Sequence, residues 1–318
     1  MIGIGLLALA AVLLFAGAEL FADNAAGAGR RLGITALAVA LLLAGAEPEE
    51  MITAVLAAIS GRPDLAAGDA VGANVTMLTL VLGLTAVLRP VPFGNRVREY
   101  AAGAAIAGVA AVVVLLDGGV SRLEGLALIT VYSALVALVW WREREPPLIG
   151  EAAEVVEDAD APAPQGTAWM PLALAVAGIG IMLGGGWVAV EGATRLVGDL
   201  GIRDSVIGLT LLALATTAEL FALAWSAARR ELSELAVAAV IGSAGYNATV
   251  SLGSAAVAQP LAVSGVLGAA IAGAALPILL IGLGWSGRVG RAGGATLLAG
   301  YAVYLFVVLT GSGGVTPS

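Results

Sequence analysis

Cysteine, histidine and lysine are all missing from the 318 residues of this sequence. Without cysteine the chain forms no disulfide bond and no thiolate site. Without histidine it lacks the Ser-His-Asp triad and the imidazole ligands of zinc and haem sites. Without lysine it cannot build a P-loop of the Walker type. These absences remove the commonest catalytic sites, so an enzyme function and a resident cofactor are not expected.

Charge is also scarce, because charged residues make up 12% of the chain while hydrophobic residues make up 60%. A soluble chain carries roughly 25% charged residues, which it needs to cover its surface. The mean hydropathy of this chain is +0.99. Its apolar surface must therefore face lipid, and we predict an all-α integral membrane protein.

The first apolar run, Ile2–Gly17, has the length of a signal-peptide core. However, no basic segment precedes it, and it continues directly into Glu19 and Asp23 without a convincing cleavage site. We therefore expect it to be a retained first transmembrane helix, with Glu19, Asp23 and the later Glu191 at a vestibule or interface.

Ten stretches are apolar enough to cross a bilayer, which takes roughly 20 residues each. They form two sets of five, which is an odd number of crossings per set. If the two sets are homologous, they must lie inverted in the membrane, as in secondary transporters. The predicted stretches are 3–22, 34–59, 65–88, 100–116 and 124–141, then 168–195, 205–228, 233–257, 260–284 and 294–311.

The segment between the two sets is acidic and interrupted by Pro162 and Pro164, so it has the composition of a solvated linker. The predicted organisation is a first five-helix repeat over 1–141, a linker over 142–167 and a second five-helix repeat over 168–318.

Arginine placement predicts the orientation, since basic residues gather in the loops on the inside of a membrane. With the N-terminus outside, eleven arginines fall in inside loops and four in outside loops, and the opposite orientation inverts that bias. We expect both termini outside, the acidic linker in the cytoplasm and, as location, a prokaryotic plasma membrane. The inside set is Arg30, Arg31, Arg89, Arg96, Arg98, Arg142, Arg144, Arg229, Arg230, Arg288 and Arg291, and the outside set is Arg62, Arg122, Arg195 and Arg203.

The two sets of helices share a sequence pattern. A polar interruption of the first helix is followed in both by a Leu-Gly-Ile triplet, at 32–34 and 200–202. Each second helix carries a polar cluster and each third helix a small-residue motif. The clusters are Ala44-Gly-Ala-Glu47-Pro48-Glu49-Glu50 and Ala215-Thr216-Thr217-Ala-Glu219, and the motifs are Gly68-Asp69-Ala-Val-Gly72-Ala-Asn74 and Ala238-Ala-Val240-Ile-Gly242-Ser243, the latter followed by Asn247.

The polar clusters are expensive in a membrane, because one carboxylate at mid-bilayer costs at least ~3 kcal/mol. No arginine lies in the apolar centres of these helices, so cations or protons must balance the charge. Pro48 frees a carbonyl group and opens its helix beside the carboxylates, and the glycines allow a neighbouring helix to approach. Carboxylate, carbonyl, hydroxyl and amide oxygens form a hard site suited to Ca²⁺, Mg²⁺, Na⁺ or H⁺. The candidate ligands are Glu47, Glu49, Glu50, Asp69, Asn74, Thr216, Thr217, Glu219, Ser243 and Asn247.

These motifs resemble the α-repeats of the calcium/cation antiporter superfamily, which includes sodium/calcium exchangers and cation/proton exchangers. The family pattern is Gly-Thr-Ser-x-Pro-Glu followed by Gly-Asn-x-x-Gly-Ser, and it falls on Gly45–Glu50 and Gly68–Ala73, with a second copy ending in Val240-Ile-Gly-Ser243. The resemblance implies alternating-access exchange of cations, with Glu50 as the acid of the first repeat. It also implies that Ser243 is the second-repeat serine.

The chain departs from that pattern at several positions. Ala46 and Glu47 stand where the family has Thr and Ser, Glu49 replaces the Pro, and Asp69 replaces the Asn. Ala73 and Met77 also stand at positions that carry Ser and an amide in the family. Fewer hydroxyls and more carboxylates favour a divalent ion or a proton-coupled site over three-sodium exchange.

The second repeat departs from the family pattern in the register of its alignment. Strict alignment puts Leu220 on the family glutamate and Glu219 on the proline. Because Glu219 is the central carboxylate of this repeat, we expect it to act through a local register shift.

Other roles are open for most of these side chains. Glu50 and Glu219 could be protonated acids bonded to a carbonyl group, and Glu47 and Glu49 could face a vestibule, since ideal helix spacing would splay them apart. Asp69 could serve a helix dipole. The amides of Asn74 and Asn247 could bond across helices, and Thr216 and Thr217 could bond back to their own helix.

The sequence therefore predicts a secondary antiporter that exchanges a divalent cation, with Ca²⁺ preferred, for Na⁺ or H⁺. A cation channel or uncoupled leak is the alternative, and the inverted repeat argues against it. The expected partners are the lipid bilayer and the transported cations, with a monomer as the transport unit. A net charge of −8 gives no reason to expect nucleic acid.

Overall fold

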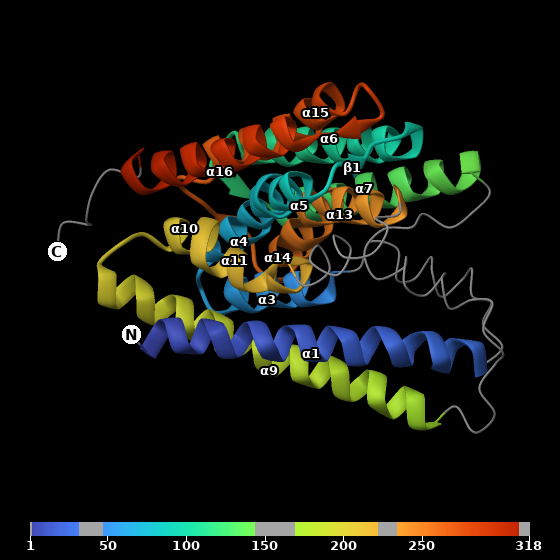
Figure 1. Cartoon of the computed structure of the whole chain (residues 1–318). Helices are drawn as coiled ribbons and strands as arrows, with labels where there is room; N and C mark the ends of the chain where they lie inside the picture. Colours follow the sequence, from blue (N-terminus) through green and yellow to red (C-terminus); the bar gives the residue numbers. More distant parts are fainter. Residues whose placement is uncertain (1, 32–46, 144–168, 222–233, 312–318) are drawn as a thin grey trace.

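The computed structural model describes residues 2–31, 47–143, 169–221 and 234–311 as a bundle of helices with two very short strand pairs (Figure 1). The first half comprises α1 (Ile2–Arg31), α3 (Pro48–Ile59), α4 (Pro63–Val75), the π-helical segment η1 (Thr76–Val81), α5 (Leu82–Leu88), β1 (Val91–Pro92), α6 (Asn95–Leu115), β2 (Gly119–Val120) and α7 (Arg122–Glu143). The second half comprises α9 (Trp169–Leu200), α10 (Asp204–Ile207), the π-helical η2 (Gly208–Leu212), α11 (Ala213–Thr216), α13 (Glu234–Tyr246), the π-helical η3 (Asn247–Ser251), α14 (Leu252–Ala258), β3 (Leu261–Ala262), α15 (Leu267–Leu283), β4 (Arg288–Val289) and α16 (Arg291–Gly311).

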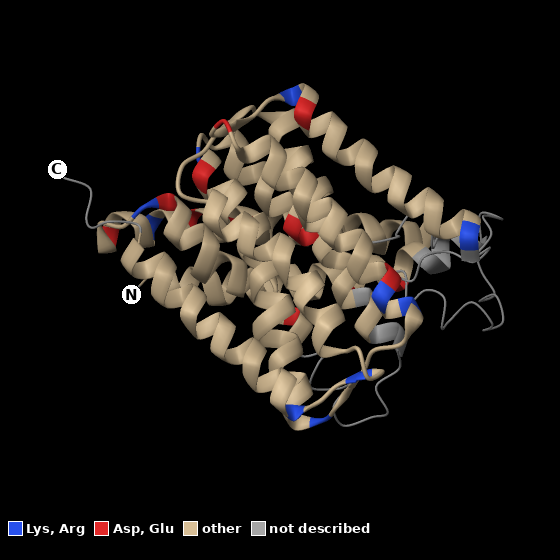
Figure 2. Ribbon diagram, turned by 90° about the horizontal axis from the view of Figure 1, so that it is seen from above, with Lys and Arg blue, Asp and Glu red and all other residues tan. Residues whose placement is uncertain are grey.

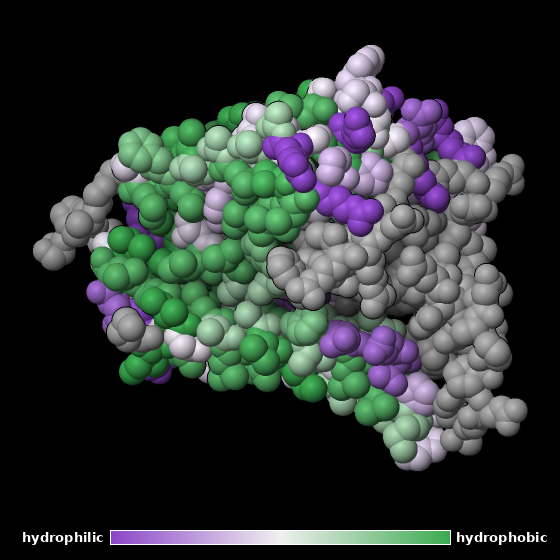
Figure 3. Space-filling model, in the orientation of Figure 1, coloured by the Kyte–Doolittle hydropathy of each residue, from purple (hydrophilic) through white to green (hydrophobic). Residues whose placement is uncertain are grey.

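The long helices carry an apolar exterior, which fits a bilayer environment. Six of the described helices are long and apolar enough to cross a membrane, and shorter or broken helices lie among them. Side chains such as Leu123, Phe306 and Val176 are largely exposed, and Figure 3 shows hydrophobic residues over a broad part of the surface. The protein is an all-α integral membrane protein, and its described residues form ten helical segments in two inverted sets. Among the described residues, several predicted helix ends differ from those observed: α1 continues to Arg31, α6 begins at Asn95, α9 continues to Leu200 and α15 begins at Leu267.

The inversion is visible where the first helices of the two halves meet. α1 and α9 pack along their length (Figure 1). A Cβ atom on Gly3 would lie 2.9 Å from the Gly192 carbonyl oxygen, and one on Gly17 would lie 2.9 Å from the Gly178 carbonyl oxygen. Because the contacts descend along α9 as they ascend along α1, the two helices run antiparallel. Corresponding helices of the two halves therefore point in opposite directions.

Short strands and helix ends of one half also pack against those of the other half. β1 pairs with β4, and β2 pairs with β3, so each strand pair takes one strand from each half. The same exchange occurs between helices: a Cβ atom on Gly294 of α16 would lie 2.7 Å from the Gly83 oxygen of α5, and one on Gly125 of α7 would lie 2.6 Å from the Gly253 oxygen of α14. Glycine is needed at these four positions because the backbones touch.

The sequence did not predict the two strand pairs or the three π-helical segments. The pairs consist of two residues per strand, which is too short for any alternating pattern to appear. The predicted linker lies almost entirely within 144–168, outside the described residues, as do the segments 32–46 and 222–233. The proposed domain boundaries therefore stay a prediction.

Candidate cation-binding site

Three acidic residues gather where α3 begins. Pro48 is the first residue of this helix, and Glu47 before it has φ −104° and ψ 75°, outside the helical region. Proline suits the first helical position because its missing N–H would be unbonded there anyway. Glu49 and Glu50 follow in the first turn, where the helix dipole stabilises negative charge. Glu47, Glu49 and Glu50 are 3%, 0% and 1% exposed.

A carboxylate from the other half joins this group. One oxygen atom each of Glu47, Glu49 and Glu219 lies within 4.8 Å of the other two. The expectation that helix spacing would splay Glu47 and Glu49 apart is therefore wrong, because Glu47 stands before the helix and does not follow its geometry. This convergence is close enough for one cation to contact all three side chains.

Glu219 reaches the group through an irregular turn. α11 ends at Thr216, and Thr217 adopts φ −83° and ψ 7° before residues 218–221 resume a helix. The next residue, Leu220, is 5% exposed and belongs to the apolar core. The structure thus places Glu219, and not Leu220, beside the first-half carboxylates. Its role as a ligand through a register shift stays a prediction.

Glu50 lies beside a second set of polar groups. The Glu47, Asp69 and Glu219 carboxyl groups are all within electrostatic range of it, and the Asn247 side chain faces it. Both Glu50 carboxyl oxygens are buried and receive no hydrogen bond in regular geometry from the part of the chain that the structure describes. The Ser243 hydroxyl lies within hydrogen-bonding range of Glu47. Buried carboxylate oxygens without donors are costly, which a bound cation would remedy.

Asp69 connects the two halves of the protein. Its Oδ1 atom accepts a hydrogen bond of 3.1 Å from the Thr216 hydroxyl, while its Oδ2 atom is buried and receives no hydrogen bond from the described residues. Asp69 is six residues beyond Pro63, the first residue of α4. A helix dipole acts within the first turn, so the dipole interpretation of Asp69 does not fit this position.

The contact between α4 and η2 depends on small residues. A Cβ atom on Gly72 would lie 2.7 Å from the Leu209 carbonyl oxygen, and one on Gly208 would lie 2.7 Å from the Leu65 carbonyl oxygen. The Tyr304 hydroxyl donates a 2.7 Å hydrogen bond to the same Leu209 oxygen. Tyr304 was missed by the sequence reasoning, since a tyrosine in an apolar helix carries no distinguishing signal.

Two π-helical segments lie at equivalent places in the halves, η1 in the third helix and η3 in its counterpart. Each contains a threonine whose hydroxyl bonds back one turn, Thr79 to the Val75 oxygen and Thr249 to the Gly245 oxygen. Such segments are frequent at functional sites. η3 begins at Asn247, whose Oδ1 atom accepts a 3.0 Å bond from Ser251. Asn74, just before η1, is buried with its Oδ1 atom unbonded among the described residues.

Thr216 and Thr217 differ in what they contact, and a paired substitution tests this. Both hydroxyls bond back to their own helix, Thr217 to the Ala213 oxygen at 2.7 Å and Thr216 to the Leu212 and Ala213 oxygens at 3.3 and 3.2 Å. Thr216 differs in that its hydroxyl also lies 3.1 Å from Asp69 Oδ1. We expect Thr216→Val to lower the apparent cation affinity about fivefold, since a lost buried bond to a charged acceptor costs about 1 kcal/mol or more. Thr217→Val should change it less than twofold. Concentration dependence of cation uptake checks both, and equal effects would contradict the assignment of Thr216.

The acidic site is separate from the surface charges. Figure 2 shows acidic residues in the interior of the bundle and arginines at its edges. The ion pairs Arg62–Asp204 and Arg195–Glu191 lie at partly or largely exposed positions near helix ends. Glu19 and Asp23 are exposed, in agreement with the vestibule or interface role expected for them.

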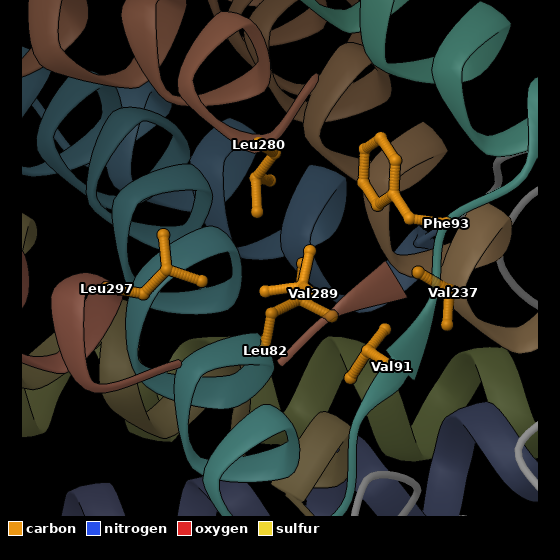
Figure 4. Close-up of a pocket in the computed structure, with 7 residues that line it drawn as sticks. All are labelled: Leu82, Val91, Phe93, Val237, Leu280, Val289 and Leu297. Carbon is orange, nitrogen blue, oxygen red and sulfur yellow. The ribbon is translucent and has the colours of Figure 1, made fainter. Parts of the chain in front are cut away.

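A pocket elsewhere in the bundle offers no competing site (Figure 4). Its lining consists only of apolar side chains, which provide no ligand for a cation. They are Leu82, Val91, Phe93, Val237, Leu280, Val289 and Leu297.

Comparison with known proteins identifies the family. The model of the sodium/calcium exchanger protein family matches residues 2–141 and 169–310. The chain belongs to the sodium/calcium exchanger family. Among its relatives, a putative antiporter CaxA of Alkalimonas amylolytica is 30% identical over 278 residues, which cover 83% of this chain and 84% of that protein. The inner membrane protein YrbG of Escherichia coli (strain K12) is 27% identical over 219 residues, covering 66% of this chain and 65% of that protein.

Solved structures show the same exchanger fold. The sodium-calcium exchanger NCX_Mj, in a structure soaked with Na⁺ and Sr²⁺, superposes with a TM-score of 0.60 at 23% identity, covering 96% of this chain and 98% of that one. The structure soaked without Na⁺ and Ca²⁺ gives a TM-score of 0.61 at 22% identity, covering 96% and 98%. The family match leaves out 142–168, the region of the predicted linker, and supports a cation antiporter.

Proposed function

We propose that the protein is a secondary active antiporter that moves a divalent cation, Ca²⁺ first among the candidates, against Na⁺ or H⁺. The observation that carries this is the convergence of Glu47 and Glu49 with Glu219 across the interface of two inverted halves. Glu50 and Asp69 lie in the same buried region. Membership of the sodium/calcium exchanger family supports the antiport mode.

The chemistry of the ligands favours a divalent ion. Ca²⁺ takes six to eight oxygen ligands at flexible positions, and carboxylates are its strongest protein ligands. Four buried carboxylates and the half-buried Glu219, with the Ser243 hydroxyl and the amides of Asn74 and Asn247 nearby, provide such a set. A single monovalent ion leaves more of this negative charge uncompensated. Several monovalent ions or protons would therefore be needed to replace one divalent ion.

The arrangement of helices suggests how access alternates. The site residues belong to α3, α4, α13, η3, the end of α11 and residues 218–221, whereas α1 and α9 form an antiparallel pair beside them (Figure 1). Glycines line the contact within this pair and let the two backbones approach closely. We propose that α1 and α9 move together across the site and open it to each side in turn.

Counter-flux in proteoliposomes tests this function. Vesicles loaded with Na⁺ at equal pH, or with an acidic interior and no Na⁺, should take up Ca²⁺ in at least one case, and uptake should stop when an ionophore collapses that gradient. The gradient that drives uptake identifies the counter-ion, and competition by Mg²⁺ or Mn²⁺ ranks the substrates. Uptake that ignores both gradients would contradict antiport and favour the uncoupled leak.

A further inference from the structure

α16 is a peripheral helix with two tyrosines on its inner face. It lies on the outside of the bundle (Figure 1), and its side chains Val303 and Phe306 are exposed. Tyr301 and Tyr304, by contrast, are both 8% exposed, and their ring centres are 6.0 Å apart. A buried tyrosine hydroxyl generally finds a hydrogen-bond partner. The partner of Tyr304 belongs to the helix that carries Thr216, so α16 contacts an element of the cation site directly.

Packing alone does not require a hydroxyl group at this place in α16. The equivalent helix of the first half is α7, because Gly125 of α7 and Gly294 of α16 make matching close contacts with the other half. Ten residues beyond these glycines stand Leu135 and Tyr304. Leu135 packs against the apolar core without a hydroxyl group. The Tyr304 hydroxyl is therefore a feature of one half, and what distinguishes it is the bond that it makes.

Tyr304 bonds to a π-helical turn. Its hydroxyl donates a 2.7 Å hydrogen bond to the Leu209 carbonyl oxygen, which lies within η2. In this turn the Ala213 N–H reaches the Gly208 oxygen, five residues earlier, whereas an α-helix pairs residues four apart. A π-helical turn therefore takes up one residue more than an α-helical turn. Converting η2 to a regular α-helix would rotate the residues that follow it by about 100° relative to those before it.

The segments on both sides of η2 are bonded to α4 or to the residue that precedes it. Before η2, Asp204 at the start of α10 accepts two bonds of 3.1 Å from the Arg62 guanidinium group, and Arg62 immediately precedes α4. After η2, the Thr216 hydroxyl bonds to Asp69 within α4. With the first contact fixed, a rotation of about 100° per lost residue would carry Thr216 away from Asp69. The π-helical form of η2 thus allows both contacts at once.

We propose that Tyr304 is a positioning residue, whose hydroxyl holds η2 in its π-helical form and so keeps Thr216 on Asp69. The same Leu209 oxygen is approached by α4, since a Cβ atom on Gly72 would lie 2.7 Å from it. A hydrogen bond in such apolar surroundings is strong because no water competes for it. The effect on cation binding rests on the proposed function, whereas the bond between α16 and η2 does not depend on it.

Hydrogen exchange of the full chain in detergent, without added divalent cations, tests the first step. Tyr304→Phe removes one oxygen atom and keeps the ring. The amide hydrogens of 208–216 should then exchange about tenfold faster, as expected for the loss of one buried hydrogen bond. Tyr301→Phe is the matched control, because the Tyr301 hydroxyl lies near Thr76 of η1, and it should leave 208–216 within twofold of the wild type. Unchanged exchange in Tyr304→Phe, or an equal effect of the control, would overturn the proposal.

A double-mutant cycle on Ca²⁺ binding, measured by calorimetry, tests the second step. Tyr304→Phe should weaken Ca²⁺ binding about fivefold, but less than twofold when Thr216→Val is already present, because the two changes remove the same contact. Effects that multiply, or faster exchange without weaker binding, would overturn the proposal.

Thr216→Val alone shows the direction of this dependence. It leaves the Tyr304 bond in place, so the amides of η2 should exchange within twofold of the wild type. Faster exchange there would overturn the proposal, even if Tyr304→Phe does not fold. A wild type that binds no Ca²⁺ would count against the proposed function, while hydrogen exchange still decides whether Tyr304 holds η2.

Discussion

Glu50→Gln is expected to reduce gradient-driven cation uptake by more than a hundredfold while leaving the protein folded. Glu50 is buried, its carboxyl oxygens lack regular hydrogen-bond donors, and three other carboxyl groups surround it. Glutamine has nearly the same shape but no charge, so it removes one negative ligand from a desolvated site. Losing such a charge costs about 3 kcal/mol or more, which is over a hundredfold in affinity. Isotope uptake into proteoliposomes measures this effect.

The matched control for Glu50→Gln is Glu19→Gln, the same change at an exposed position of α1. It should retain uptake within twofold of the wild type. Size-exclusion profiles and thermal unfolding in detergent should be unchanged for both variants. A folded Glu50→Gln protein with wild-type uptake would refute the assignment of Glu50 as a ligand.

Glu219→Gln is expected to have an effect of the same size, because it removes the carboxylate that the second half contributes to the group with Glu47 and Glu49. Without it, that group would belong to the first half alone. The two halves would then no longer share the cation, and coupling between ion binding and their relative movement should fail. Cation uptake and cation binding should both be measured, since a variant that binds but does not exchange separates the two roles.

A residue swap tests the register shift at the same place. In the double variant Glu219→Leu with Leu220→Glu, the acid stands where strict alignment with the family motif puts it. Leu220 is 5% exposed and packs in the apolar core, so we expect this variant to lose exchange and to be less stable. Exchange at the wild-type rate would show that Glu219 has no special position.

The membrane class, the ten helical segments and the family could be predicted because they depend on composition and on motifs that repeat along the chain. The acidic residues of the site could be found for a similar reason, since carboxylates in apolar stretches stand out. The convergence of Glu47 and Glu49 could not be predicted from the sequence, because it depends on the backbone conformation of the one residue before Pro48. Periodicity assumes a regular helix and fails where the helix begins.

Other features are formed by contacts distant in sequence. The bond from Thr216 to Asp69 joins residues 147 positions apart, and neither residue alone indicates the other as its partner. The pairing of β1 with β4 is likewise decided by the crossing of the two halves and not by the few residues in each strand. The linker, by contrast, stays a prediction from composition, as do the roles of individual ligands and the identity of the ions.

The central claim is that the transported cation sits among the carboxylates shared by the two halves. Crystals grown with Mn²⁺ in place of Ca²⁺, measured above the manganese absorption edge, locate that ion directly. The expected result is an anomalous peak in contact with Glu219 and with at least one of Glu47, Glu49 and Glu50, which is lost in Glu50→Gln crystals. A peak elsewhere, or none in a preparation that exchanges Mn²⁺, would contradict the account.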